Sequence, residues 1–200
     1  MDKTRQFEAI RTALAAAPGL VLRRAFHPAA DWPMPDGQDG QALQSIYAST
    51  REEELASLPW PPAQKQEFLA MQFKAQHADY SSNRPDGVFA LLEKAGQTVG
   101  RLCLDWVGND CRIVDIALLP PWRNQGLGGA VLDCLMRQAD AEGYSLSIHV
   151  EKHNPARRLY QRKGFELIEA GGVYDLMQRP AQRAEPASRV QCEVEEIGGE

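Results

Sequence analysis

A glycine-rich turn between two apolar segments is the feature of the sequence with the clearest chemical use. The segment CRIVDIALL (111–119) leads through Pro120-Pro121-Trp122 into Arg123-Asn124-Gln125-Gly126-Leu127-Gly128-Gly129, and a helical pattern follows. A strand that enters a helix through such a turn leaves backbone N–H groups without intrahelical partners, and the helix dipole adds partial positive charge. Gly126 and Gly128 have no Cβ to keep an anion away from the backbone. The turn therefore predicts a phosphate-binding site.

The turn does not match two common nucleotide-binding motifs. Ala130 and Val131 follow the glycines, so the dinucleotide fingerprint GxGxxG is not met, and the Lys-Ser/Thr of the Walker motif is missing. By itself, the turn leaves open a structural use in which the glycines only permit a tight strand-to-helix connection. The choice of ligand depends on a second motif.

The second motif lies about 30 residues downstream. The segment Asn154-Pro155-Ala156-Arg157-Arg158-Leu159-Tyr160-Gln161-Arg162-Lys163-Gly164-Phe165 resembles the signature N-x-A-x-x-x-Y-x-x-x-G-F of the GCN5-related N-acetyltransferases (GNAT family). Arg123-x-x-Gly126-x-Gly128 resembles that family's acetyl-CoA motif, Arg/Gln-x-x-Gly-x-Gly/Ala. The motifs stand in the family's order, separated by a helix and a strand. The resemblance covers roughly residues 86–180 and extends less specifically to 20–85.

The resemblance implies acetyl-CoA as the co-substrate and an amine as the acceptor, with no metal. It places the pyrophosphate on the turn formed by Arg123, Asn124, Gln125, Gly126, Leu127, Gly128 and Gly129. The backbone of Ile116, Ala117 and Leu118 would pair with the pantetheine arm, and an N–H near Leu118 would serve as the oxyanion donor. Asn154 and Arg157 would contact CoA. For Asn154, a role as the N-cap of the next helix is a sufficient alternative, and Arg157 could instead belong to a solvated helix face.

Acetylation of an amine needs a proton acceptor, because an amine with a pKa near ~10.4 is mostly protonated at neutral pH. Asp115 is the first candidate, since it interrupts an apolar strand just before the turn and a buried carboxylate is costly unless it is used or satisfied. A structural role at a splayed strand edge is equally open for Asp115. The rivals are Glu52–Glu54, expected near a helix start where a solvated face is the common outcome, and Glu151.

The departing CoA thiolate benefits from a proton donor, and the resemblance assigns this role to Tyr160. A phenol with a pKa near ~10 stays protonated at rest and can still donate to a thiolate. A core aromatic that packs with Phe165 is the alternative. His149 and His153 are expected to be structural. Trp60, Trp106 and Trp122 could line an acceptor pocket, with core or rim packing as the default.

The order of predicted elements gives the fold class. A helix (1–17), a strand (20–26), a loop (28–40), two helices that reach Tyr80, three strands from Val88 to 119, a helix (127–142) ended by Gly143, a strand (144–150), a helix ended by Gly164, and a hairpin around Gly171-Gly172 follow one another. This pattern predicts an α/β (α+β) fold with a mixed, mostly antiparallel sheet of six to seven strands flanked by helices on both faces. We expect a helical extension (1–18), an acetyltransferase domain (19–180) and a disordered acidic tail (181–200).

Composition limits the other classes of function. The chain has 200 residues with a net charge of −5 and no apolar run long enough for a membrane span. The start of the chain also lacks a secretion-signal pattern, so we expect a cytoplasmic protein with reduced thiols. The four cysteines form no CxxC pair and no His lies at zinc-finger spacing, which disfavours a metal site. The charge argues against nonspecific nucleic-acid binding.

Three functional readings remain open from the sequence. The first is an enzyme that moves acetyl from acetyl-CoA to a primary amine of a small molecule or peptide by direct attack. The second is a non-catalytic acyl-CoA-binding or interaction module on the same fold. The third is an acetyltransferase that acts on a protein or on aminoacyl-tRNA. A homodimer is compatible with all three.

Overall fold

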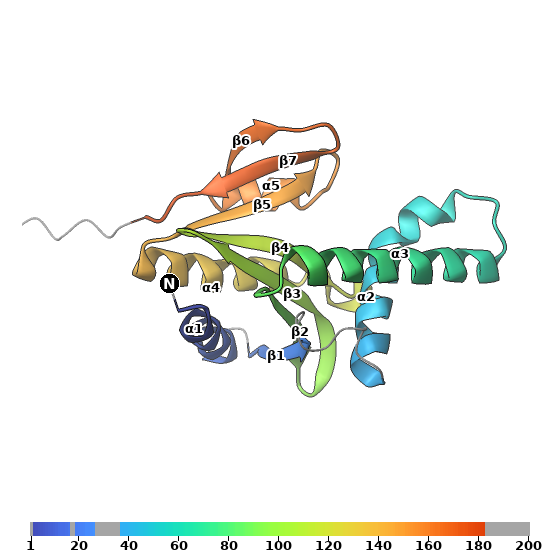
Figure 1. Ribbon diagram of the computed structural model, residues 1–200, viewed down its shortest axis with the longest axis horizontal. Helices are drawn as coiled ribbons and strands as arrows, with labels where there is room; N and C mark the ends of the chain where they lie inside the picture. The colour runs from blue at the N-terminus through green and yellow to red at the C-terminus, as the bar shows by residue number, and fades with distance from the viewer. Residues whose placement is uncertain (1, 17–18, 27–36, 183–200) are drawn as a thin grey trace, which may run out of the picture.

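A computed structural model describes residues 2–16, 19–26 and 37–182, and its ribbon is shown in Figure 1. The elements, in chain order, are α1 (Lys3–Ala16), β1 (Val21–Phe26), α2 (Gln38–Ala56), α3 (Pro62–Asn83), β2 (Val88–Lys94), β3 (Gln97–Val107), β4 (Asp110–Leu118), the 3-10 turn η1 (Pro120–Trp122), α4 (Leu127–Glu142), β5 (Ser145–Glu151), α5 (Arg157–Arg162), β6 (Glu166–Ala170) and β7 (Tyr174–Arg179).

Within the described residues, the seven strands form one sheet in the order β1-β2-β3-β4-β5-β7-β6. Each neighbouring pair is antiparallel except β4 and β5, which run parallel. The parallel pair is joined by α4, as a parallel connection requires a crossover. The mixed, mostly antiparallel sheet predicted from the sequence is confirmed, and β4 occupies its centre as the nearly continuous apolar run of that strand suggested.

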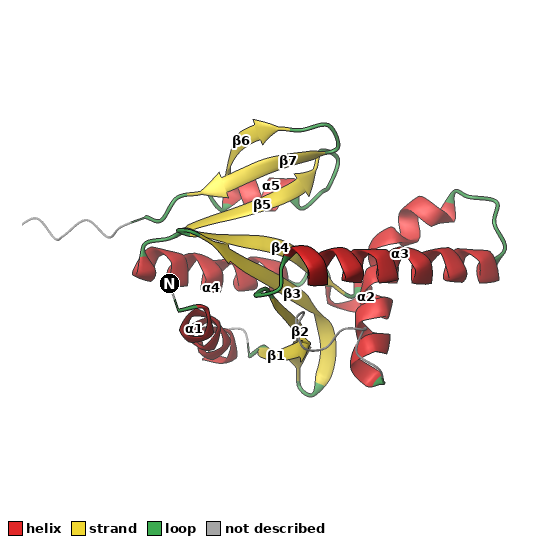
Figure 2. Ribbon diagram, in the orientation of Figure 1, coloured by secondary structure: helices red, strands yellow, loops and turns green. Residues whose placement is uncertain are grey.

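Helices cover both faces of the sheet (Figure 2). Strand β2 shows how the faces divide: Val88, Ala90 and Leu92 belong to the larger core cluster, whereas Phe89 and Leu91 belong to a second cluster. The larger cluster includes the buried apolar side chains of α1 and α4, and the second includes Leu43, Ile46 and Tyr47 of α2 and Phe73 of α3. Helix α1 is therefore part of the core, through Phe7, Ile10 and Leu14.

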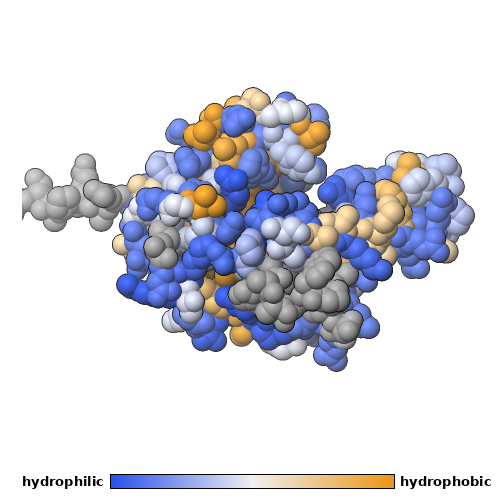
Figure 3. All heavy atoms as spheres, in the orientation of Figure 1, coloured by the Kyte–Doolittle hydropathy of each residue, from blue (hydrophilic) through white to orange (hydrophobic). Residues whose placement is uncertain are grey.

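Local sequence signals account for several boundaries. Helix α4 begins after Gly126 (φ 79°) and ends at Gly143 (φ 77°), both in the left-handed region that glycine adopts readily. The turn between β2 and β3 has positive φ at Ala95 and Gly96, as a tight hairpin turn requires. The hairpin of β6 and β7 around Gly171-Gly172 is also confirmed. Its outer strand carries exposed Leu167 and Ile168, and apolar colour gathers over this part of the surface in Figure 3.

Some boundaries differ from the sequence prediction. Glu52–Glu54 do not lie near a helix start, because α2 continues without a break from Gln38 to Ala56 and places them in its last turns. Helix α5 begins at Arg157, three residues after Asn154. Most of the predicted loop (28–40) and most of the predicted tail lie outside the described residues. None of the described helices is both long and apolar enough to cross a membrane.

Candidate active site

Strands β4 and β5 separate in the middle of the sheet. Their pairing runs only from Asp110↔Ser145 to Ile113↔Ile148, although both strands continue further. Beyond Ile113, the edge of β4 that faces β5 has no strand partner in the part of the chain that the structure describes, and this edge includes the predicted pantetheine-binding residues Ile116–Leu118. The sheet thus offers an open backbone edge to which an extended ligand can add.

A β-bulge sets the direction of Asp115. In the pairing of β3 with β4, Leu104 lies opposite Ile113 and Cys103 opposite Asp115, so Val114 is an extra residue. A bulge disturbs the alternation of side chains along a strand. Asp115 therefore shares a face with Cys103, on the side of α2 and α3. The simple alternation of a regular strand would have turned this carboxylate toward the opposite face.

The phosphate-binding turn has the conformation expected of an anion site. Asn124 (φ 59°) and Gly126 (φ 79°) are both left-handed, and consecutive N–H groups in such a turn form a concave nest. Ala130 is the first residue of α4 whose N–H returns to a backbone carbonyl, that of Gly126, at 3.0 Å. The N–H groups of the preceding helical residues, Leu127–Gly129, belong to the first turn and lack intrahelical acceptors. The side-chain amide of Gln125 fixes the turn by donating to the Pro121 carbonyl.

The side chains of the two predicted cofactor-binding arginines bind protein oxygens. Arg123 donates to the Leu118 carbonyl at 2.8 Å and to Ser49 of α2. Arg157 pairs with Asp175 of β7. The hydrogen bond from Arg157 lowers the pKa of the Asp175 carboxyl below its ordinary value. In this structure both guanidinium groups position elements around the site.

A close backbone approach holds the open edge of β4 in place. A Cβ built on Gly100 of β3 would lie 2.2 Å from the Ala117 carbonyl oxygen and 3.1 Å from Leu118 Cα. Real Cβ atoms are essentially never found this close to other atoms, so only glycine fits. Gly100 was not identified from the sequence, because the need for it arises only once the register of the hairpin is known.

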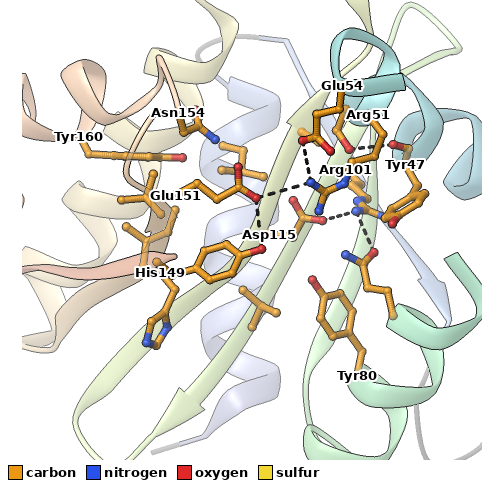
Figure 4. A pocket seen from close by; sticks show the side chains of 18 residues that line it. Tyr47, Arg51, Glu54, Tyr80, Arg101, Asp115, His149, Glu151, Asn154 and Tyr160 are labelled. Atoms are coloured by element: carbon orange, nitrogen blue, oxygen red, sulfur yellow. Dashed lines mark hydrogen bonds and ion pairs between the residues drawn. The ribbon is translucent and has the colours of Figure 1, made fainter. Parts of the chain in front are cut away.

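A cavity of about 230 Å³ opens where β4 and β5 separate (Figure 4). Its walls come from α2, α3, the ends of β4 and β5, helix α5 with the segment that leads into it, and one residue each of β3 and β7. The lining residues are Tyr47, Thr50, Arg51, Glu54, Gln76, Tyr80, Arg101, Val114, Asp115, Ile116, Ala117, Ile148, His149, Val150, Glu151, Asn154, Tyr160 and Tyr174. Both predicted catalytic residues, Asp115 and Tyr160, therefore lie on one cavity.

Asp115 forms an ion pair with Arg101, a residue that the sequence analysis did not single out. Arg101 is 4% exposed, and it also donates to Gln76 of α3 at 3.1 Å. Burial by itself lowers the pKa of this guanidinium, but Asp115, together with Cys103 and Tyr80, more than offsets that effect and the pKa is raised. Arg101 was visible as a charge within the apolar strand GRLCLDWV, but a hairpin register counted without the bulge would have turned Asp115 toward the opposite face.

A second set of charged side chains lies across the cavity, between α2 and β5. Arg51 donates to Glu54 at 2.9 Å and lies 3.5 Å from a carboxylate oxygen of Glu151, which also accepts the Tyr174 hydroxyl at 3.1 Å. Glu54 and Glu151, both rivals for the role of the base, thus face the same space. Glu52 and Glu53 are exposed and do not line the cavity.

Tyr160 is 5% exposed and its hydroxyl points into the cavity from α5 (Figure 4). Its ring packs edge-on against Phe165 at 5.8 Å. Burial, and secondly the negative charge of Asp115, raise the pKa of the phenol above its ordinary value. The segment before α5 is held by the Asn154 side chain, which accepts the Ala156 N–H at 2.9 Å.

The remaining candidates, three tryptophans and His149, differ in whether they line the cavity. Trp106 is buried in the larger core cluster, Trp122 packs against that cluster and Trp60 packs edge-on against Phe68. None of these tryptophans lines the cavity, so core or rim packing, the default expectation, is correct. His149 lines the cavity from β5, and burial followed by the charge of Arg112 lowers its imidazole pKa. Within the described residues, no group of three or more His, Cys, Asp or Glu side chains is arranged to hold a metal ion.

Comparison with known proteins identifies the family. Residues 44–165, more than half of the chain, match the model of the acetyltransferase (GNAT) family. A Bacillus subtilis (strain 168) protein named for alanine N-acetylation of ribosomal protein bS18 is 32% identical over 92 residues, which are 44% of this chain and 58% of that protein. The match thus spans less than two thirds of that relative's length.

Solved structures show the same fold. An acetyltransferase from Thermus thermophilus is 21% identical, with a TM-score of 0.54 over 80% of this chain and 96% of that chain. The PaiA N-acetyltransferase from Thermoplasma acidophilum, solved in complex with coenzyme A, is 14% identical, with a TM-score of 0.53 over 70% of this chain and 91% of that chain. These two structures show the fold, and the match to the family model shows the class of protein. The chain belongs to the GNAT acetyltransferase family.

Proposed function

We propose that this protein transfers acetyl from acetyl-CoA to a primary amine by direct attack in the cavity between β4 and β5. The observation that carries the proposal is the meeting of Asp115 and Tyr160 on one cavity, beside a turn with free backbone N–H groups. A binding module would need the turn and the open strand edge, but it would not need a buried phenol that points at the ligand.

The donor would lie along residues that already have the required geometry. The pyrophosphate would accept hydrogen bonds from the N–H groups of the turn 124–129, in the positive field at the start of α4. The pantetheine arm would add to the open edge at Ile116–Leu118, as an extra strand does. The thioester would then reach the cavity floor, where an N–H near Leu118 would stabilise the oxyanion.

The acceptor amine must lose a proton before or during attack. Asp115 points into the cavity, but it also neutralises Arg101, and a proton retained on Asp115 would leave a buried cation without its counter-charge. We therefore propose that Asp115 acts through a water molecule that passes the proton onward. Glu151, which lines the same cavity from the facing strand and has a 34% exposed side chain, would serve as the outlet.

The bond changes then balance within the cavity. The amine nitrogen attacks the thioester carbonyl carbon, the intermediate collapses, and the bond between carbon and sulphur breaks. Tyr160 donates its proton to the departing CoA sulphur. It is reprotonated by the second proton of the ammonium group, which the nitrogen loses as the amide forms, while the first proton leaves through the water at Asp115 and Glu151. The raised pKa of Tyr160 keeps the phenol protonated until the thiolate forms.

The charges of the cavity suit a cationic acceptor. Three carboxylates (Glu54, Asp115 and Glu151) face two guanidinium groups (Arg51 and Arg101), which leaves an excess of negative charge for an ammonium ion. A peptide or protein N-terminus is the acceptor favoured by the relative named for alanine N-acetylation. Small amines are the alternative. A cavity of about 230 Å³ would hold a small amine whole, whereas it would hold only the end of a peptide.

Thiol release from acetyl-CoA tests the proposal. The panel contains polyamines, amino acids, aminoglycosides and peptides with free N-termini, including a peptide that begins with alanine. We expect turnover with at least one amine, and the N-acetylated product should be found by mass spectrometry. Measurable CoA binding without turnover on any acceptor would instead support the non-catalytic binding module.

A further inference from the structure

The guanidinium group of Arg123 joins three segments that are distant in sequence. Its Nε donates to the Leu118 carbonyl at 2.8 Å, and one terminal nitrogen donates to the Ser49 carbonyl at 2.9 Å and to Ser49 Oγ at 3.0 Å. Ser49 is 6% exposed in the middle of α2. The phosphate-binding turn, the end of β4 and helix α2 are thus tied together at one side chain.

The charge on Arg123 has no protein counter-charge. All three of its acceptor oxygens are neutral, and no carboxylate among the described residues lies within 4.0 Å of it. The residue stands three positions before Gly126, at the entrance of the turn. An anion bound at the turn would therefore supply the missing negative charge, and it would hold the guanidinium more firmly in its present position.

Helix α2 carries one wall of the acceptor cavity. Tyr47, Thr50, Arg51 and Glu54 all line the cavity, and they lie within five residues of Ser49 along the helix. Besides Arg123, apolar packing in the smaller core cluster holds α2 through Leu43, Ile46 and Tyr47. Polar pairs also hold it: Asp39 with Arg23, Tyr47 with Gln72, and Arg51 with Glu151. A displacement of Ser49 would therefore move the acceptor wall as a unit.

We infer that Arg123 is a positioning residue that couples occupation of the CoA turn to the position of α2, so that donor binding prepares the acceptor wall. The inference rests on the proposed binding of CoA at the turn. A lysine cannot replace Arg123 in this role. Its single ammonium group lacks the planar fork that reaches Leu118 and Ser49 at the same time.

Amide hydrogen exchange of peptides from α2 (38–56), with and without saturating CoA, tests the coupling, and calorimetry measures CoA binding on the same samples. In the wild-type protein we expect CoA to slow exchange of the amides around Ser49 by about fivefold or more, the lower end of typical coupling between sites. In Arg123→Lys, CoA should still bind through the turn, but the extra protection of α2 should be lost. Ser49→Ala removes one of the three acceptor oxygens and should give an intermediate effect.

Arg137→Lys is the matched control, because Arg137 is exposed on α4 and its guanidinium donates to Cys134 of the same helix. This control should keep the wild-type response. CoA binding without added protection of α2 in the wild type, or full protection in Arg123→Lys, would overturn the coupling and leave the proposed function intact. An absence of CoA binding to the wild type would overturn both. If Arg123 only stabilised the fold, Arg123→Lys would lower the amide protection of α2 equally with and without CoA. That result would also overturn the coupling.

Discussion

Replacement of Gly100 by alanine tests whether the close approach of β3 to β4 builds the CoA-binding edge. The new Cβ would lie 2.2 Å from the Ala117 carbonyl oxygen, and contacts below 3.0 Å are essentially absent from proteins, so the strands must separate by about 0.8 Å. The adjacent hydrogen bond from the Leu119 N–H to the Val99 carbonyl, now 2.9 Å, would stretch beyond useful length. Backbone atoms form the obstacle, so a rotamer change cannot relieve it.

The expected cost follows from these two effects. Overpacking costs about 1–3 kcal/mol and a lost hydrogen bond about 1 kcal/mol, so the free energy of unfolding should fall by roughly 2–4 kcal/mol. For a domain of this size, the melting temperature should fall by roughly 4–16 °C. Because the displaced segment includes Ile116–Leu118, the Kd for acetyl-CoA should rise by about tenfold or more.

Thermal melts and calorimetric titration with acetyl-CoA measure both effects. Gly172→Ala is the matched control, because a Cβ at Gly172 meets no atom within 4 Å and the residue does not need a positive φ. The control should melt within about 1–2 °C of the wild type. Wild-type stability and wild-type affinity in Gly100→Ala would refute the assignment of β4 as a rigid edge positioned by β3.

Two further predictions concern charged pairs at the site. Asp115→Asn leaves the buried Arg101 cation without its carboxylate, so urea unfolding should show a loss of about 3–5 kcal/mol. A loss below about 1 kcal/mol would show that Arg101 does not depend on this pair. The lowered pKa of Asp175 means that its pair with Arg157 stabilises the fold above about pH 4 and that this stabilisation is lost as the pH falls through the lowered pKa. Melting temperatures of the wild type and Asp175→Asn should differ near about pH 7 and converge near about pH 2; a constant difference would contradict the assignment.

Local patterns sufficed for the parts of the site that depend on neighbours in sequence. The apolar spacing and the flanking glycines gave α4 its observed bounds, Leu127–Glu142 with Gly143 as the C-cap, and thereby placed the phosphate-binding turn. The downstream motif likewise predicted a short helix with Tyr160, and that side chain does line the cavity. These features form over a few residues, where capping, turn chemistry and periodicity act.

The parts that the sequence analysis missed depend on contacts between distant segments. The extra residue Val114 turns Asp115 toward Arg101, and nothing in the local pattern of the strand marks a bulge there. Arg123 was predicted to bind the cofactor, but its guanidinium reaches Ser49, 74 residues away. Gly100 resembles any other strand glycine until β4 is paired with β3. Each of these assignments requires the register of the sheet or the packing of α2.

The measurement that tests the account most directly is the rate of CoA thiol release by the wild type and by Tyr160→Phe, at saturating acetyl-CoA and with an acceptor from the amine panel. Phenylalanine keeps the ring that packs against Phe165, so CoA affinity and melting temperature should stay close to those of the wild type. Because the variant lacks the proton donor to the thiolate, we expect kcat to fall by about 10²–10⁴-fold. The raised pKa of Tyr160 also predicts that the wild-type rate shows no loss from phenol ionisation up to about pH 10. A wild-type kcat in Tyr160→Phe would contradict the proposed mechanism.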